Sequence, residues 1–232
     1  MPIQNFEKIL EKTRRKSNKE IFFNLDVTAN MRGGYFKFLN YGNLFLENRY
    51  VNRYDISCTI SYHPELTLRN IWHLAKYVRL QSIQCEVPYI GDFVLKDEAE
   101  TGKNYPDAYP LEFWFAVAFF CNPLMWFAPS TVKKEDRRII ARMNELHKKY
   151  REDIFTGVIM PVGDEPGPES LSGLVSEIDG EAKFIALYRG INAENNSFDV
   201  DGEWEIIAGD AEFEYNKIII PEKASFAILK RK

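Results

Sequence analysis

The chain has 232 residues, of which 45% are hydrophobic and 14% aromatic, so it can bury a full core as one large domain or two small ones. Its formal net charge of −4 gives no electrostatic footprint for nucleic acid, which we therefore exclude as an expected partner. The three cysteines, Cys58, Cys85 and Cys121, are widely spaced and form no CxxC pair, so we expect neither a metal site nor a disulfide framework.

The N-terminal sequence MPIQNFEKILEKTRRK lacks the apolar segment of a signal peptide, which favours a cytoplasmic location. The most apolar run, Phe113–Ala128, is shorter than the roughly 20 residues of a membrane-spanning helix, and Pro123 interrupts it. We therefore expect no membrane partner and interpret this run as a buried strand or helix.

Residues 1–154 are expected to form an α/β part. Apolar residues at helical spacing indicate amphipathic helices, and short apolar runs indicate strands. In chain order the expected elements are a helix over Asn5–Lys16, strands over Ile21–Asp26 and Leu44–Glu47, a helix over Leu68–Val78 capped by Thr67, a strand over Ser82–Val87, an apolar element over Phe113–Phe120 and a helix over Lys133–Tyr150.

Residues 155–232 have a different character and are expected to form an antiparallel β-domain. Glycine and proline cluster in GVIMPVGDEPGPESLSG, within which we interpret GDEPG, residues Gly163–Gly167, as a turn. Short apolar runs separated by turn residues follow, as in an antiparallel sandwich. These runs are Phe184–Arg189, Trp204–Ile207, Phe213–Tyr215, Ile218–Ile220 and Ser225–Leu229.

The first two expected strands each end in a carboxylate, Asp26 and Glu47. In α/β sheets and barrels the chemistry lies at the carboxyl ends of the strands. Neighbouring strands lie about 4.8 Å apart. This spacing suits the carboxyl separations of about 5–5.5 Å in retaining and about 6.5–9.5 Å in inverting glycoside hydrolysis. The pattern therefore indicates paired carboxylate chemistry of either stereochemical outcome.

Structural alternatives remain open for each of these acids. Asp26 could cap the strand end by accepting hydrogen bonds from the backbone of Thr28 or Ala29. Glu47 could form a buried ion pair with Arg49, because residues two apart in a strand face the same side. Glu86 ends the third expected strand and could line the same cleft or stay outside it.

Five segments in this order resemble the C-terminal half of (β/α)8-barrel glycoside hydrolases of the melibiase or α-galactosidase-like clan. They are NLDVTANMRGGYF, YGNLFLENRY, TLRNIWHLAKYV, NPLMWF and GVIMPVGDEPGPESLSGLVS. The resemblance covers about Ile21–Arg189. It implies a partial TIM-type barrel over residues 1–154, a β-domain over residues 155–232, two catalytic carboxylates and no cofactor.

The site expected from the residues and the resemblance has Asp26 and Glu47 as its catalytic acids. Around them we expect Arg32, Tyr35, Arg49, Tyr50 and Glu86 to contact a carbohydrate, with the tyrosine rings as stacking platforms. The chain would then be a glycoside hydrolase fragment or subunit. The alternative is a non-catalytic remnant that binds a carbohydrate or a protein. Four strand candidates are half of a barrel, so we expect a partner: a chain carrying the first half, or a second copy.

Overall fold

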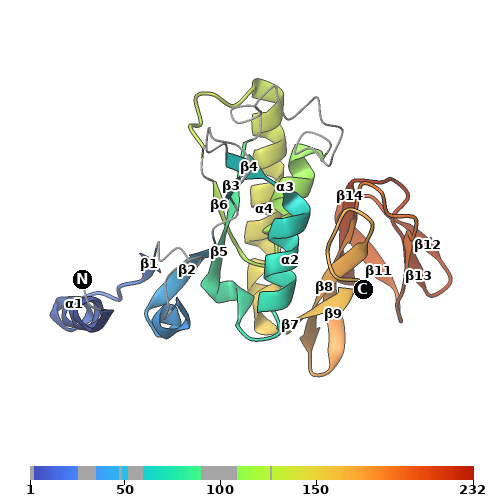
Figure 1. Cartoon of the computed structure of the whole chain (residues 1–232). Coiled ribbons are helices and arrows are strands. Elements are labelled where there is room, and N and C mark those ends of the chain that lie inside the picture. Colours follow the sequence, from blue (N-terminus) through green and yellow to red (C-terminus); the bar gives the residue numbers. More distant parts are fainter. Residues whose placement is uncertain (1–2, 26–34, 47–48, 52–59, 90–108, 126) are drawn as a thin grey trace.

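A computed structural model describes residues 3–25, 35–46, 49–51, 60–89, 109–125 and 127–232 (Figure 1). The described chain forms an α/β part followed by antiparallel sheets. In Figure 1 the C-terminal sheets lie beside the central helices, and the N-terminal helix α1 (Ile3–Lys16) lies at the opposite end of the molecule.

A four-stranded parallel sheet organises the α/β part. Its strands are adjacent in the order in which they occur in the chain, with registers that pair Phe23 with Gly42, Leu44 with Ile83 and Cys85 with Pro123. This confirms that the first two predicted strands are parallel neighbours. The strands are β1 (Phe23–Leu25), β2 (Gly42–Leu46), β5 (Ile83–Val87) and β6 (Asn122–Met125).

Helices and short turns lie between these parallel strands. The 3-10 turn η2 (Tyr35–Asn40) lies between β1 and β2, helix α2 (Pro64–Leu74) and the 3-10 turn η3 (Leu80–Ser82) lie between β2 and β5, and helix α3 (Leu111–Val117) lies between β5 and β6. Helix α4 (Lys134–Thr156) follows β6, the last strand of the sheet. A small antiparallel hairpin, β3 (Arg49–Val51) and β4 (Ile60–Tyr62), precedes α2.

The predicted N-cap at Thr67 is wrong, because helix α2 already begins at Pro64, three residues earlier. His63 is the N-cap and Pro64 occupies the first turn. Proline suits this place because its fixed φ matches the helix and its missing N–H has no partner there. Thr67 instead donates its backbone N–H to the carbonyl of His63 at 3.0 Å.

The apolar run Phe113–Ala128, which was interpreted as a buried strand or helix, contains both a helix and a strand. Its first part is α3, and β6 follows after a turn. Pro123 lies within β6, which pairs with β5 only in the described structure. An edge strand tolerates proline because the missing N–H is not needed by a second neighbour.

The C-terminal part is antiparallel, as predicted. One sheet has the order β11-β14-β9-β8-β7 and the other β10-β13-β12. The strands are β7 (Val158–Gly163), β8 (Leu171–Ile178), β9 (Glu181–Arg189), β10 (Ser197–Asp199), β11 (Trp204–Gly209), β12 (Glu212–Glu214), β13 (Lys217–Ile219) and β14 (Ser225–Arg231).

Strand β7 and the first residues of β8 lie in the glycine- and proline-rich stretch, on either side of the turn predicted at Gly163–Gly167. Pro161 is accommodated because β7 is an edge strand that pairs only with β8. Gly173 lies in β8 where a Cβ atom would come within 2.4 Å of the Ala186 carbonyl oxygen on β9. Glycine here serves the close approach of two strands rather than a turn.

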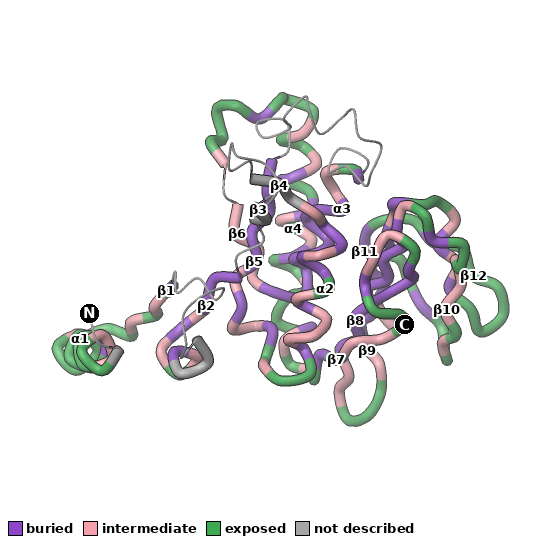
Figure 2. The backbone as a smooth tube through the Cα atoms, in the orientation of Figure 1, coloured by how far each residue is buried: buried purple, intermediate pink, exposed green. Residues whose placement is uncertain are grey.

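One cluster of buried apolar side chains runs through both parts of the chain (Figure 2). Phe113 on α3 packs edge-on against Tyr188 on β9, with ring centroids 5.8 Å apart. Phe113 also packs against Phe226 on β14 at 6.2 Å. The helices that cover the parallel sheet therefore also support the five-stranded sheet.

Candidate functional site

The two faces of the parallel sheet differ in chemical character. Side chains alternate between the faces along each strand. One face is apolar and belongs to the main core cluster, and each of its six side chains is at most 6% exposed. It consists of Leu25, Leu44, Leu46, Ile83, Cys85 and Val87.

The opposite face carries amides and a carboxylate. The register pairs Asn24 with Asn43 across β1 and β2, and Gln84 with Asn122 across β5 and β6. Asn24 is exposed and the other three amides are half-buried. Glu86 lies on the same face, two residues after Gln84 and nearer the carboxyl end of β5. We name this set, Asn24, Asn43, Gln84, Glu86 and Asn122, the polar face.

Glu86 is the most buried member of the polar face, at 1% exposure. Its register partner on β6 is Leu124, and Phe45 on β2, which pairs with Gln84, is also buried. Asn122 donates from Nδ2 to the backbone carbonyl of Gln81. The polar face thus combines apolar surface with groups that donate and accept hydrogen bonds, as small-molecule sites do.

The predicted catalytic acids adjoin this sheet in the sequence. Asp26 directly follows Leu25, the last residue of β1, and Glu47 directly follows Leu46, the last residue of β2. Asp26, Glu47 and Arg32 lie outside the described residues. The expected separation of the two carboxyl groups therefore stays a prediction, and so does the alternative ion pair of Glu47 with Arg49.

The remaining predicted site residues fall in short elements between the strands. Tyr35 is the first residue of η2. Arg49 and Tyr50 lie in β3, where they pair with Tyr62 and Ser61 of β4. Among the predicted site residues whose side chains the structure describes, Glu86 lies on the polar face.

A buried acid that the sequence analysis missed lies in the first turn of α2. Glu65 is 6% exposed, and its Oε1 lies 4.0 Å from Nδ1 of His63. Within the described part of the chain its Oε2 has no hydrogen-bond partner. Burial raises the pKa of Glu65, against a smaller opposing effect of a backbone hydrogen bond. The His63–Pro64–Glu65 sequence at the start of an apolar helix was the available signal.

Tyr109 is a further titratable side chain close to this acid. Its hydroxyl accepts a hydrogen bond from the backbone N–H of Ile191 at 3.2 Å, which ties the start of α3 to the segment after β9. Burial raises the pKa of Tyr109 well above its usual range, and the charge of Glu65 adds to this rise. The phenol therefore stays protonated at neutral pH.

A second histidine–glutamate pair lies on the exposed side of α2. His73 Nε2 is 3.4 Å from Oε1 of Glu165, in the turn between β7 and β8, and Arg69 also contacts this carboxylate. The hydrogen bond from His73 is the main cause that lowers the pKa of Glu165. Both side chains of this pair are largely exposed, His73 at 46% and Glu165 at 43%, and the pair connects α2 to the turn between β7 and β8.

The buried cysteines and the third histidine belong to the core. Cys85 and Cys121 are free thiols, and burial raises the pKa of both well above the usual range, so both stay unreactive thiols. His147 Nε2 donates to the Cys121 carbonyl at 3.1 Å. Burial lowers the pKa of His147 to about 4, so it is neutral at physiological pH.

Two further classes of feature are absent where the structure can be inspected. Among the described residues, no group of three or more His, Cys, Asp or Glu side chains is placed to hold a metal ion. None of the described helices is both long and apolar enough to cross a membrane.

Comparison with known proteins does not assign the chain to a family. No protein-family model matches the chain, and a search of curated proteins found no match either.

Proposed function

We propose that the chain is carbohydrate-active and that the polar face of its parallel sheet receives the sugar. The observation that carries this proposal is the segregation of Asn24, Asn43, Gln84, Glu86 and Asn122 to one face of the sheet. Asparagine and glutamine amides both donate and accept hydrogen bonds, which matches the donor and acceptor capacity of sugar hydroxyls.

The proposed reaction is glycoside hydrolysis by Asp26 and Glu47. Four parallel strands in chain order, with α2 between β2 and β5 and α3 between β5 and β6, are compatible with half of a (β/α)8 barrel, in which chemistry lies at the carboxyl ends of the strands. Both acids follow such ends directly. One would be ionised to attack or to activate water, and the other, with a raised pKa, would protonate the leaving oxygen.

The assignment of the fold to a half TIM-type barrel with a C-terminal β-sandwich is part of this proposal. So are the sugar contacts of Arg32, Tyr35, Arg49 and Tyr50. Asp26 comes two residues after Asn24, which lies on the polar face, so a strand that continued by one residue would direct Asp26 to the same face. Glu47 likewise comes two residues after Phe45 and four after Asn43, so a continued β2 would direct it to the same face as these residues.

A hydrolase assay tests the reaction. Purified protein is screened against aryl α- and β-glycosides, alone and with a polypeptide that supplies the first half of such a barrel. We expect turnover in the complemented sample and its loss in Asp26→Asn and Glu47→Gln. Glu205→Gln, at an exposed acid of β11, is the matched control and should keep full activity. Equal activity in all variants would contradict the paired-acid mechanism.

A non-catalytic binding module is the second candidate function. It is favoured by the pairing of β1 and β6 on one side only among the described residues, since a closed barrel needs eight strands and the described sheet has four. Such a chain would bind sugar or a protein without turnover. Sugar binding by calorimetry, together with no release of the aryl group under any condition, would select this function over hydrolysis.

A further inference from the structure

We propose that copies of this chain associate head to tail, with a basic face of α1 in one copy docked on an acidic tip of the C-terminal sheets in the next. The contact uses no strand pairing at the parallel sheet, so it is distinct from a partner that completes a barrel, and it does not depend on the proposed function. The basic face consists of Lys8, Ile9, Lys12 and Lys16, and the acidic tip consists of Asp210, Glu212, Phe213, Glu214 and Tyr215.

The small net charge of the chain conceals two segments of opposite charge. Residues 1–20 contain six basic and three acidic residues, whereas residues 194–216 contain eight acidic residues and no lysine or arginine. Such surfaces attract each other over about one Debye length, roughly 10 Å at 0.1 M salt. The eight acids are Glu194, Asp199, Asp201, Glu203, Glu205, Asp210, Glu212 and Glu214.

Helix α1 is attached to the rest of the chain through its apolar side. Phe6 packs edge-on against Phe38 of η2, with ring centroids 5.4 Å apart, and Leu10 is buried. Arg14 donates a hydrogen bond to the backbone carbonyl of Tyr41 at 2.6 Å. These contacts hold the helix in place and occupy the side that carries Phe6, Leu10 and Arg14.

The basic face lies on the other side of α1. Ile9, Lys12 and Lys16 are three and four residues apart, so they form one stripe along the helix, and Lys8 lies beside it. All four side chains are exposed, Ile9 at 50%. Within the described residues none of the three lysines forms an ion pair. An exposed apolar residue among cations suits a surface that combines acids with apolar side chains.

The acidic tip is such a surface, and a tyrosine marks its end. Glu214 of β12 pairs with Lys217 of β13, so Tyr215 and Asn216 form a two-residue loop. Tyr215 is fully exposed and has a φ of 51°, in the left-handed region. Glycine and asparagine are the usual residues at such a loop position, so a tyrosine there costs stability and points to a use for its ring.

Three acids and a second exposed aromatic residue adjoin this tyrosine. Phe213 is 46% exposed and lies between Glu212 and Glu214, and Asp210 precedes β12. The three acids are exposed, and in the described part of the chain none of them forms an ion pair. Lys217, the basic residue of this hairpin, contacts an acid of β10 instead. Lysines of another copy can therefore form both ion pairs and cation–π contacts here.

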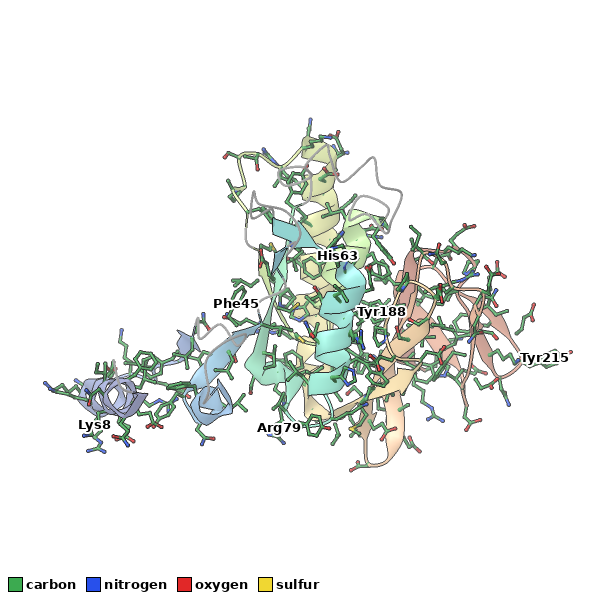
Figure 3. The ribbon with its side chains drawn as sticks, viewed as in Figure 1. Lys8, Phe45, His63, Arg79, Tyr188 and Tyr215 are labelled. Atoms are coloured by element: carbon green, nitrogen blue, oxygen red, sulfur yellow. The ribbon has the colours of Figure 1, made fainter. Side chains whose placement is uncertain are left out.

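The two surfaces lie at opposite ends of the molecule. Figure 3 shows Lys8 at one end and Tyr215 at the other. One chain therefore cannot place its own α1 on its own acidic tip, and the complementary surfaces meet only between copies. Because the two surfaces differ, each copy can use both of them, which produces a closed ring or an open row of copies.

The test is sedimentation velocity of the full chain over a series of concentrations. The wild type should form species larger than the monomer at about 0.02 M salt, and these should dissociate at about 0.5 M salt, where the charges are screened. Lys8→Glu with Lys12→Glu, and separately Glu212→Lys with Glu214→Lys, should each raise the dissociation constant at least about tenfold, because like charges then face each other.

A mixture of the two charge-reversed variants makes the test specific. Each variant alone has two surfaces of the same sign, whereas the mixture again offers surfaces of opposite sign, so association should return. The control is Lys134→Glu with Arg138→Glu, at exposed positions of α4, which changes the net charge as much as the α1 variant does and should associate like the wild type.

Three results would overturn the proposal. The first is a wild type that stays monomeric at low salt, including a monomer whose α1 binds anionic phospholipid vesicles instead. The second is self-association that neither pair of charge reversals weakens. The third is a mixture of the two variants that associates no better than each variant alone.

Discussion

The hydroxyl of Tyr188 on β9 donates a 2.6 Å hydrogen bond to the backbone carbonyl of Ala116 on α3. Both residues are at most 1% exposed. Burial raises the pKa of Tyr188 well above its usual value, so the donor keeps its proton at any physiological pH. The C-terminal sheet is therefore attached to the α/β part by a specific polar contact within a shared apolar core.

Tyr188→Phe should destabilise the chain by about 1–2 kcal/mol, because the Ala116 carbonyl loses its partner in a buried environment. Chemical denaturation followed by circular dichroism measures this change. Tyr215→Phe, at a fully exposed tyrosine, is the control and should have no effect. A Tyr188→Phe variant as stable as the wild type would show that the hydrogen bond contributes nothing.

Glu65→Gln should make the stability of the chain less dependent on pH. Because burial raises the folded-state pKa of Glu65 above its unfolded value, its contribution is fully present below the unfolded pKa of about 4.3 and is lost as the pH rises through the folded pKa. The variant should therefore gain stability relative to the wild type at pH 7.5, and the gain should shrink at pH 4.5. Urea denaturation at pH 4.5 and pH 7.5 measures the free energy of unfolding of both proteins. An equal difference in stability between variant and wild type at the two pH values would contradict this effect of Glu65.

The lowered pKa of His147 leads us to expect that the free energy of unfolding decreases in acid. Its pKa is lowered to about 4 in the folded state, from about 6.5 when unfolded, so its contribution is present above pH 6.5 and is lost as the pH falls toward 4. The full difference is on the order of 3 kcal/mol. In His147→Gln the decline between pH 6.5 and pH 4.5 should be smaller, because this variant has no buried imidazole to protonate. An equal decline in variant and wild type would exclude His147 as its source.

Gly173→Ala should destabilise the five-stranded sheet by about 1–3 kcal/mol, since the new Cβ would lie 2.4 Å from the Ala186 carbonyl oxygen. Gly167→Ala is the matched control, because its Cβ would meet no atom within 4 Å. That variant should be neutral, or more stable by up to about 1 kcal/mol through its effect on the unfolded chain. Thermal unfolding of both variants compares them, and equal melting temperatures would mean that β8 and β9 can move apart without cost.

The elements that the sequence predicted best are those with one clear periodicity. The amphipathic helix expected over Asn5–Lys16 is α1, and the one expected over Lys133–Tyr150 is α4, which continues to Thr156. The apolar runs before Asp26 and Glu47 are parallel neighbours. Strands β7 and β8 escaped prediction because composition cannot distinguish a glycine in a turn from one that lets two strands approach closely.

The candidate site was harder to predict, for two physical reasons. The polar face depends on registers between strands far apart in the chain, such as the pairing of Gln84 with Asn122. In the sequence, Glu65 resembles the exposed acidic residues that are common in the first turn of a helix. Its burial, at 6% exposure, arises only in the folded chain, and no local sequence pattern encodes it.

The central claim, that the polar face binds a carbohydrate, is tested most directly by calorimetric titration of the full chain with galactose, glucose and their methyl α-glycosides. We predict that at least one of these sugars binds, that Glu86→Gln weakens the binding at least about tenfold through loss of a charge-assisted hydrogen bond, and that Glu205→Gln leaves it unchanged. Absence of binding by all four sugars, or equal binding by the wild type and Glu86→Gln, would contradict the account.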